Sequence, residues 1–111
     1  MSKMKQSIDE VMEMMGDLSK HQPESLRHFN AFMGEVLKGG VLDTKTKELI
    51  AVGTSITARC GYCIALHVKK ALDAGANRDE IFEAATVAML MGGGPAMAHI
   101  VEVKKALDEF A

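Results

Sequence analysis

Hydrophobic residues recur at intervals of three and four along most of the chain, a spacing that predicts amphipathic helices. The first predicted helix is expected to end at Gly16 and Asp17. A second helix is predicted to begin at Pro23, because proline suits a first helical turn, and to end at the glycines 39–40. The two predicted stripes are Met4, Ile8, Val11, Met12 and Met15 in the first helix, and Leu26, Phe29, Met33, Val36 and Leu37 in the second.

Two further helices are predicted in the middle of the chain. Asp43 is expected to be the N-cap of a third helix that runs to about residue 59. The Cys-Gly-Tyr-Cys motif at 60–63 is expected to open a fourth helix, which ends near Gly75. The predicted inner face of the third helix comprises Leu49, Val52, Gly53 and Ile56.

The last third of the chain begins with Asn77 and Glu80, whose spacing resembles a capping box. The helix that follows is expected to break at the glycines 92–94, and Pro95 is expected to open the last helix. The predicted inner residues are Ile81, Ala84, Ala85, Ala88 and Met91 before the break, and Ala96, Ile100, Val103 and Leu107 after it. The predicted outer residues of the last helix are His99, Glu102, Lys105 and Glu109. No segment alternates as a strand would, so we predict an all-α fold of about five helices.

The segment 84–91 is apolar nearly all round, and such a helix must be covered on every side. Five short helices can hardly cover it alone, so we expect a homo-oligomer. The alternative is that this segment is simply the central core helix.

Composition limits the classes of protein that fit. The 111 residues suit a single domain over 1–111, with 48% hydrophobic and 25% charged residues and a formal net charge of −2. This charge offers no basic surface for nucleic acid or an anionic membrane. The apolar stretch 84–103 is broken at 92–95, so neither part reaches the ~20 residues of a membrane span. We expect a cytoplasmic protein, in which two cysteines are not a structural staple.

The candidate chemistry is concentrated at Cys60, Cys63 and His67, which share one helical face at i, i+3 and i+7. A helix N-terminus directs amide N–H groups and the positive end of the helix dipole at a Cys-x-x-Cys pair, which favours the thiolate. His67 could accept or relay the thiol proton. Glu48, on the preceding helix, could turn back toward the thiols.

Less specific interpretations remain open for the same residues. The two cysteines could be inert buried thiols. They could also bind structural zinc together with His67, but such sites almost always take four ligands, and His99 is the only candidate for the fourth. Tyr62 could line the thiol pocket or lie at a subunit contact, and His99 is either structural or faces the site.

Glu48, eleven intervening residues, and then Cys-x-x-Cys-x-x-x-His at 60–67 resemble the signature of AhpD-like alkylhydroperoxidases, in the carboxymuconolactone decarboxylase family. The resemblance covers about residues 29–110 and includes the segments 42–50, 75–81 and 91–96. It implies an all-α helical bundle in which a helix hairpin carries the motif. It also implies assembly into hexamers or trimers, and activity without a metal or other cofactor.

The resemblance further implies roles for individual residues. Cys63 would be the thiol activated through His67 and Glu48, and Cys60 would be its partner in a disulfide. The better-known hydroperoxidases have a histidine where this chain has Tyr62. We therefore expect a thiol-dependent peroxidase that reduces hydroperoxides and is recharged by a lipoyl or thioredoxin-like dithiol donor. The alternatives are a disulfide reductase with little peroxidase activity, and a non-catalytic oligomeric module that binds a metal or a partner.

Overall fold

The computed structural model describes residues 3–111, and these form an all-α fold with five helices. No strand is present within that part of the chain. The helices are α1 (Lys3–His21), α2 (Pro23–Leu37), α3 (Thr44–Thr57), α4 (Gly61–Asp73) and α5 (Arg78–Phe110). The predicted fold class is therefore confirmed.

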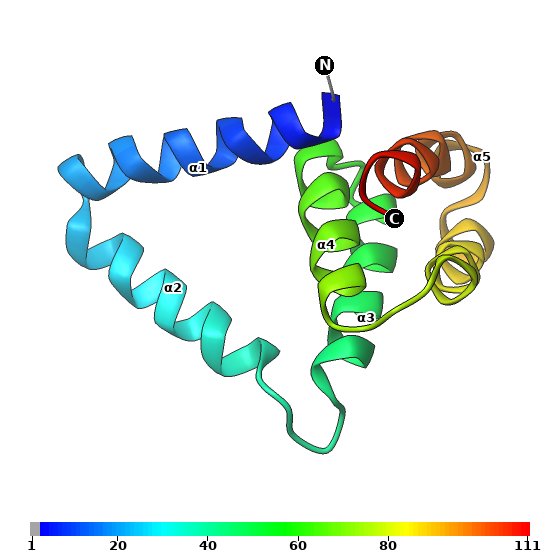
Figure 1. Ribbon diagram of the computed structural model, residues 1–111, viewed down its shortest axis with the longest axis horizontal. Helices are drawn as coiled ribbons and strands as arrows, with labels where there is room; N and C mark the ends of the chain where they lie inside the picture. Colours follow the sequence, from blue (N-terminus) through cyan, green and yellow to red (C-terminus); the bar gives the residue numbers. More distant parts are fainter. Residues whose placement is uncertain (1–2) are drawn as a thin grey trace.

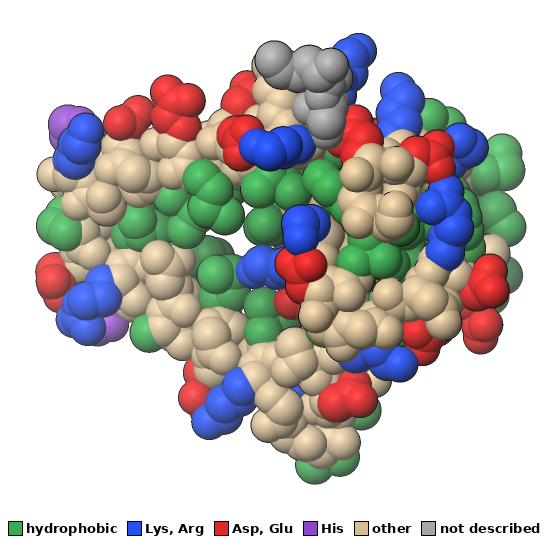
Figure 2. All heavy atoms as spheres, viewed as in Figure 1, with side chains coloured by type: hydrophobic (Ala, Val, Ile, Leu, Met, Phe, Trp, Pro, Cys, Tyr) green, Lys and Arg blue, Asp and Glu red, His purple; other side chains and the backbone are tan. Residues whose placement is uncertain are grey.

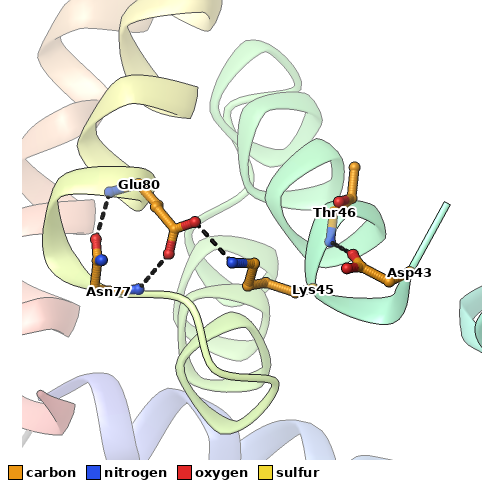
Figure 3. A network of polar contacts seen from close by, with 5 residues as sticks. All are labelled: Asp43, Lys45, Thr46, Asn77 and Glu80. Atoms are coloured by element: carbon orange, nitrogen blue, oxygen red, sulfur yellow. Dashed lines mark hydrogen bonds and ion pairs between the residues drawn. The ribbon is translucent and has the colours of Figure 1, made fainter.

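Local hydrogen bonds explain where the later helices begin. The Asp43 side chain accepts the Thr46 amide at 2.8 Å and caps α3, as predicted. At α5, the Asn77 side chain accepts the Glu80 amide at 2.8 Å, and the Glu80 carboxylate accepts the Asn77 amide at 3.0 Å. Figure 3 shows that Glu80 also reaches Lys45 on α3, at 2.8 Å. This contact ties the first turns of α3 and α5 together.

Two predicted boundaries are wrong or incomplete. The first helix does not end at Gly16 and Asp17 but continues to His21, because glycine is tolerated inside a helix at a modest cost. The predicted break at 92–94 is a kink inside one helical element. Only Gly93 departs from helical backbone there, with φ 69° and ψ −150°, and Pro95 lies just beyond it.

The helices α3 and α4 form a hairpin that packs against both halves of α5 (Figure 1). The α1 helix crosses the start of α4, and the Met4 amide donates to the Glu109 carboxylate at 2.9 Å near the end of α5. The fully buried large side chains all come from α3, α4 and α5: Val52, Ile56, Ile64, Val68, Ile81, Val103 and Leu107. The core thus lies directly beneath the turn that carries the two cysteines.

The helices α1 and α2 form an arm that stands away from this core (Figure 1). No residue of α2 is fully buried: Leu26, Met33 and Leu37 of its predicted stripe are only partly covered, and Phe29 is 58% exposed. Figure 2 shows hydrophobic side chains around the hollow between the arm and α3–α4. Met12 and Met91, both predicted to face inward, are likewise exposed. At each of these positions, a single chain leaves part of its apolar surface uncovered.

The α5 helix is long and apolar enough to cross a membrane by length and composition alone. The kink at Gly93 divides it, however, and each half packs one side on the core, through Ile81 and Ala85 before the kink and Val103 and Leu107 after it. We therefore interpret α5 as a helix that packs along one side of the core and leaves Leu90 and Met91 exposed on its other side.

Candidate redox site

A tight turn between α3 and α4 places the first cysteine. Arg59 adopts a left-handed backbone conformation, with φ 59°, which is unfavourable for a residue with a side chain. The amide of Arg59 donates to the Ile56 carbonyl at 3.0 Å and the amide of Cys60 donates to the Ser55 carbonyl at 3.1 Å. These two bonds close α3 and direct the chain back at once into α4.

Cys60 is the N-cap of α4, and its Sγ accepts the Cys63 amide at 3.2 Å. The two cysteines are joined by a disulfide, with Cα atoms 5.2 Å apart, a separation usual for such bonds. Both cysteines are partly buried, so neither is sealed inside the core. The predicted arrangement of the motif at the start of a helix is therefore observed.

Glu48 and His67 face each other across the α3–α4 hairpin. His67 Nδ1 lies 2.7 Å from Glu48 Oε1, and the Glu48 side chain is only 4% exposed. An ionised carboxylate can only accept hydrogen bonds, so the proton between them belongs to Nδ1 of His67. The other ring nitrogen, Nε2, is then an acceptor, as a base needs to be. His67 lies one helical turn beyond Cys63 on the same face.

The structure places Tyr62 at the surface and away from the core. Its side chain is 50% exposed and lines a cavity of about 430 Å³ with residues of α1, among them Val11 and Met14. Tyr62 thus lies beside the arm, next to the cysteine motif.

His99 lies one turn before Glu102 on α5, and the two side chains are hydrogen-bonded to each other. A Cβ on Gly61 would overlap the Glu102 carboxylate, so this pair lies against the residue that follows Cys60. The prediction that Glu102 lies on the outer side of the last helix is therefore wrong. Helical spacing alone gave no indication of this contact, because it depends on where the kink at Gly93 directs the rest of α5.

This arrangement can support a dithiol–disulfide cycle. The start of α4 stabilises a thiolate, the partner sulfur is within bonding distance, and a histidine oriented by a buried carboxylate is close in the sequence. Within residues 3–111, no three His, Cys, Asp or Glu side chains are grouped as a metal site would require.

An apolar groove lies elsewhere, between α3 and α5. It has a volume of about 530 Å³ and an apolar lining that includes Leu49, Ile50, Val87 and Met91. Neither cysteine lines it. We call it the α3–α5 groove and attribute no redox chemistry to it.

Comparison with known proteins places the chain in a family. The profile of the carboxymuconolactone decarboxylase family matches residues 23–106. An uncharacterised protein of the cox locus of Paracoccus denitrificans is 36% identical over 103 residues, which cover 93% of each chain. An uncharacterised protein of Cupriavidus necator is 31% identical over 107 residues, covering 96% of this chain and 92% of its own.

Solved structures agree with this assignment. A carboxymuconolactone decarboxylase family protein from Legionella pneumophila superposes with a TM-score of 0.95 at 31% identity, over 99% of this chain and 98% of that one. A family member from Thermotoga maritima, for which an antioxidative role has been suggested, gives 0.82 at 29% identity over 92% and 87% of the two chains. The chain belongs to the carboxymuconolactone decarboxylase family, and the resemblance inferred from its cysteine motif is confirmed.

Proposed function

We propose that this protein is a thiol-dependent oxidoreductase that reduces hydroperoxides through a Cys60–Cys63 dithiol/disulfide cycle. The observation that carries the proposal is the disulfide at the start of α4, one helical turn from a histidine held by the buried Glu48. The antioxidative role suggested for the Thermotoga maritima relative supports the same class of chemistry. We assign the reaction to the cytoplasm, where dithiol donors are kept reduced.

In the proposed cycle the Cys63 thiolate attacks the terminal oxygen of the hydroperoxide. The O–O bond breaks, the alcohol leaves with a proton, and Cys63 becomes a sulfenic acid. The Cys60 sulfur then attacks the Cys63 sulfur, which releases water and forms the disulfide. His67 accepts the first thiol proton, and Glu48 holds its ring in place. An external dithiol of lipoyl or thioredoxin-like type reduces the disulfide by exchange and is itself oxidised.

A disulfide reductase with little peroxidase activity is the second candidate. The observation that favours it is Tyr62, which stands where better-known hydroperoxidases of the family have a histidine and is directed to the surface beside α1. The two candidates share the cysteine cycle and differ in the oxidant.

The test uses the fully reduced protein and an organic hydroperoxide, with free thiols counted over time. We expect both thiols to disappear as an intramolecular disulfide forms, and Cys63→Ser to abolish rapid peroxide consumption. The Cys60→Ser/Cys63→Ser double variant controls for the nine methionines, which also react with peroxide. Peroxide consumption by Cys63→Ser at the wild-type rate would refute the cycle. Rapid turnover of a small aromatic disulfide together with slow turnover of peroxide would establish the second candidate instead.

We further propose that the working form is a homo-oligomer, most simply a hexamer, with a trimer as the alternative. The support is the apolar surface that one chain leaves uncovered. Leu90 and Met91 are 81% and 77% exposed, and the α3–α5 groove lies beside them. Exposed apolar patches of this kind commonly mark subunit contacts.

A further inference from the structure

A second histidine–carboxylate pair lies beside the cysteine motif, and the proposed cycle does not use it. His99 Nδ1 is hydrogen-bonded to Glu102 Oε1, one turn apart on the second half of α5. Their side chains are 31% and 27% exposed, so the pair is partly desolvated. It comes from a different helix than Glu48 and His67, which belong to α3 and α4.

The contact with the motif is made through Gly61. A Cβ built on this residue would overlap Glu102 Oε2 and would lie 3.6 Å from the carboxyl carbon. The carboxylate therefore occupies the space of a missing side chain at the first position of α4, adjacent to Cys60. Any residue larger than glycine at this position would displace it.

This position brings two negative charges together when the protein is reduced. The positive end of the α4 dipole favours both the Glu102 carboxylate and a Cys60 thiolate. A disulfide carries no charge, so only the reduced form experiences repulsion from Glu102. The carboxylate therefore opposes thiolate formation at Cys60 and favours the disulfide over the dithiol.

We propose that Glu102, held by His99, is a positioning residue that suppresses ionisation of the Cys60 thiol and makes the Cys60–Cys63 disulfide harder to reduce. This inference rests on the proposed dithiol/disulfide cycle. The affected step is exchange with a donor dithiol: the S–S bond of the protein breaks and the S–S bond of the donor forms. The two electrons and the two protons of the donor thiols pass to Cys60 and Cys63.

Other titratable groups lie on the elements packed around the motif and must be held constant in the test. Those on the helices and the turn packed around the motif are Glu10 on α1, Glu48 on α3, Arg59 in the turn, Tyr62 and His67 on α4, and His99 on α5. Glu102→Gln leaves all of them in place. It removes one negative charge and keeps the shape of the side chain.

The experiment compares Glu102→Gln with Glu13→Gln, an exposed carboxylate on α1 whose removal changes the net charge equally. Thiolate absorbance in the ultraviolet gives the pH of half-ionisation of the reduced protein. Equilibration with a dithiothreitol buffer, quantified by mass spectrometry, gives the position of the disulfide equilibrium. We expect Glu102→Gln to ionise at lower pH and to shift the equilibrium about three- to tenfold toward the dithiol. A tenfold shift corresponds to about 30 mV.

The pH profile separates this charge effect from a structural one. The difference between Glu102→Gln and wild type should be largest above the pH at which the thiol ionises, and should vanish at lower pH where the reduced form has no thiolate. Gly61→Ala, which displaces the Glu102 carboxylate, should lower the ionisation pH of the wild type and have no such effect in the Glu102→Gln background. Far-ultraviolet circular dichroism verifies that each variant is folded.

The outcomes distinguish this inference from the proposed function. If wild type cycles between dithiol and disulfide while Glu102→Gln matches Glu13→Gln in both measurements, the role of Glu102 is refuted and the cycle stands. If wild type cannot be cycled at all, the proposed function itself fails. A Gly61→Ala effect of equal size in both backgrounds would also refute the role of Glu102.

Discussion

Glu48 is a buried carboxylate, and its only hydrogen-bond partner among the described side chains is His67. Burying a charge in this way is costly unless it is paired, so a purely structural position of this kind is better filled by an apolar side chain. Its hydrogen bond to His67 fits a role in orienting the imidazole. Substitution of Glu48 can separate its cost in folding stability from its effect on the rate of the thiol reaction.

Replacing Glu48 by Gln keeps a hydrogen-bond acceptor for His67 Nδ1 but removes the charge that stabilises an imidazolium. We expect Glu48→Gln to remain folded and to form the disulfide with peroxide about 10²-fold more slowly than wild type, which is typical for loss of general acid–base assistance. Stopped-flow peroxide consumption measures the rate, with Glu13→Gln as the exposed control. An unchanged rate would show that the pair is structural.

For individual site residues, the sequence predicted the positions that depend on a single helix, but not the contacts between helices. Cys63 and His67 lie one turn apart on the same face of α4, and Cys60, the N-cap of that helix, is joined to Cys63 by the disulfide. Their relation to Glu48 needed the hairpin, for which only the family resemblance gave a reason. Glu102 could not be found, because it is far from Gly61 in the chain and reaches it only through the packing of the second half of α5 against the start of α4.

Among the helices, α5 depends on one residue for its kink. Gly93 has φ 69° and ψ −150°, a backbone conformation essentially restricted to glycine. We expect Gly93→Ala to reduce the free energy of unfolding by about 1–3 kcal/mol. Gly94→Ala is the matched control, because its Cβ would meet nothing within 4 Å and its φ is not positive. Urea denaturation measures both, and equal stability of the two variants would contradict the prediction.

The ion pair that joins α3 to α5 predicts how stability depends on pH (Figure 3). The hydrogen bond from Lys45 holds the pKa of Glu80 below its ordinary value of 4.5, and the same bond raises the pKa of Lys45 above 10.5. A lowered carboxyl pKa stabilises the fold above the unfolded value and is lost as pH falls through the folded value. The raised lysine pKa stabilises below the unfolded value and is lost as pH rises through the folded one.

We therefore expect Glu80→Gln to lower the Tm between about pH 5 and pH 10 and to match wild type in acid below the folded pKa. Thermal melts across this range measure the difference. Glu83→Gln, an exposed carboxylate one turn further along α5 with no ion pair among the described residues, is the control. A deficit of Glu80→Gln that persists unchanged at low pH would show that the capping bond, not the charge, is responsible.

The sequence predicted where α3, α4 and α5 begin but not where α1 ends, and the difference has a physical reason. Asp43, Asn77 and Cys60 each accept the amide three residues ahead, so each N-cap can be recognised from a few adjacent residues. Gly16 resembles a stop, but glycine also fits inside a helix, at a cost of about 1 kcal/mol. The local sequence does not distinguish these two cases, and in the structure α1 continues to His21.

For the molecule as a whole, the uncovered apolar surface predicts self-association. We expect light scattering on the wild-type protein to give six times the 12.0 kDa chain mass, or three times for the trimer alternative. Val87→Glu places a charge in the α3–α5 groove and should shift the protein to smaller species. Gln6→Glu, an equal charge change at an exposed position of α1, should not. A monomeric wild type would contradict the proposal.

The position of the α1–α2 arm is the least predictable part of the fold. Its helices follow from their stripes, but no residue of α2 is buried within the described chain, and its end is tied to α3 by hydrogen bonds such as that from Lys47 Nζ to the Val36 carbonyl. The family comparison resolves this, because the Legionella pneumophila structure superposes over 99% of the chain, including the arm.

One consequence of the α4 cap extends beyond catalysis. Cys60 Sγ is both a redox centre and the acceptor for the Cys63 amide, so above the pH at which Cys60 ionises, reduction replaces a weak disulfide acceptor with a stronger thiolate acceptor. At such pH the hydrogen bond of the Cys63 amide should therefore be stronger in the reduced protein than in the oxidised protein. The exchange of a single amide hydrogen with solvent deuterium would then report the oxidation state of the protein without any added probe.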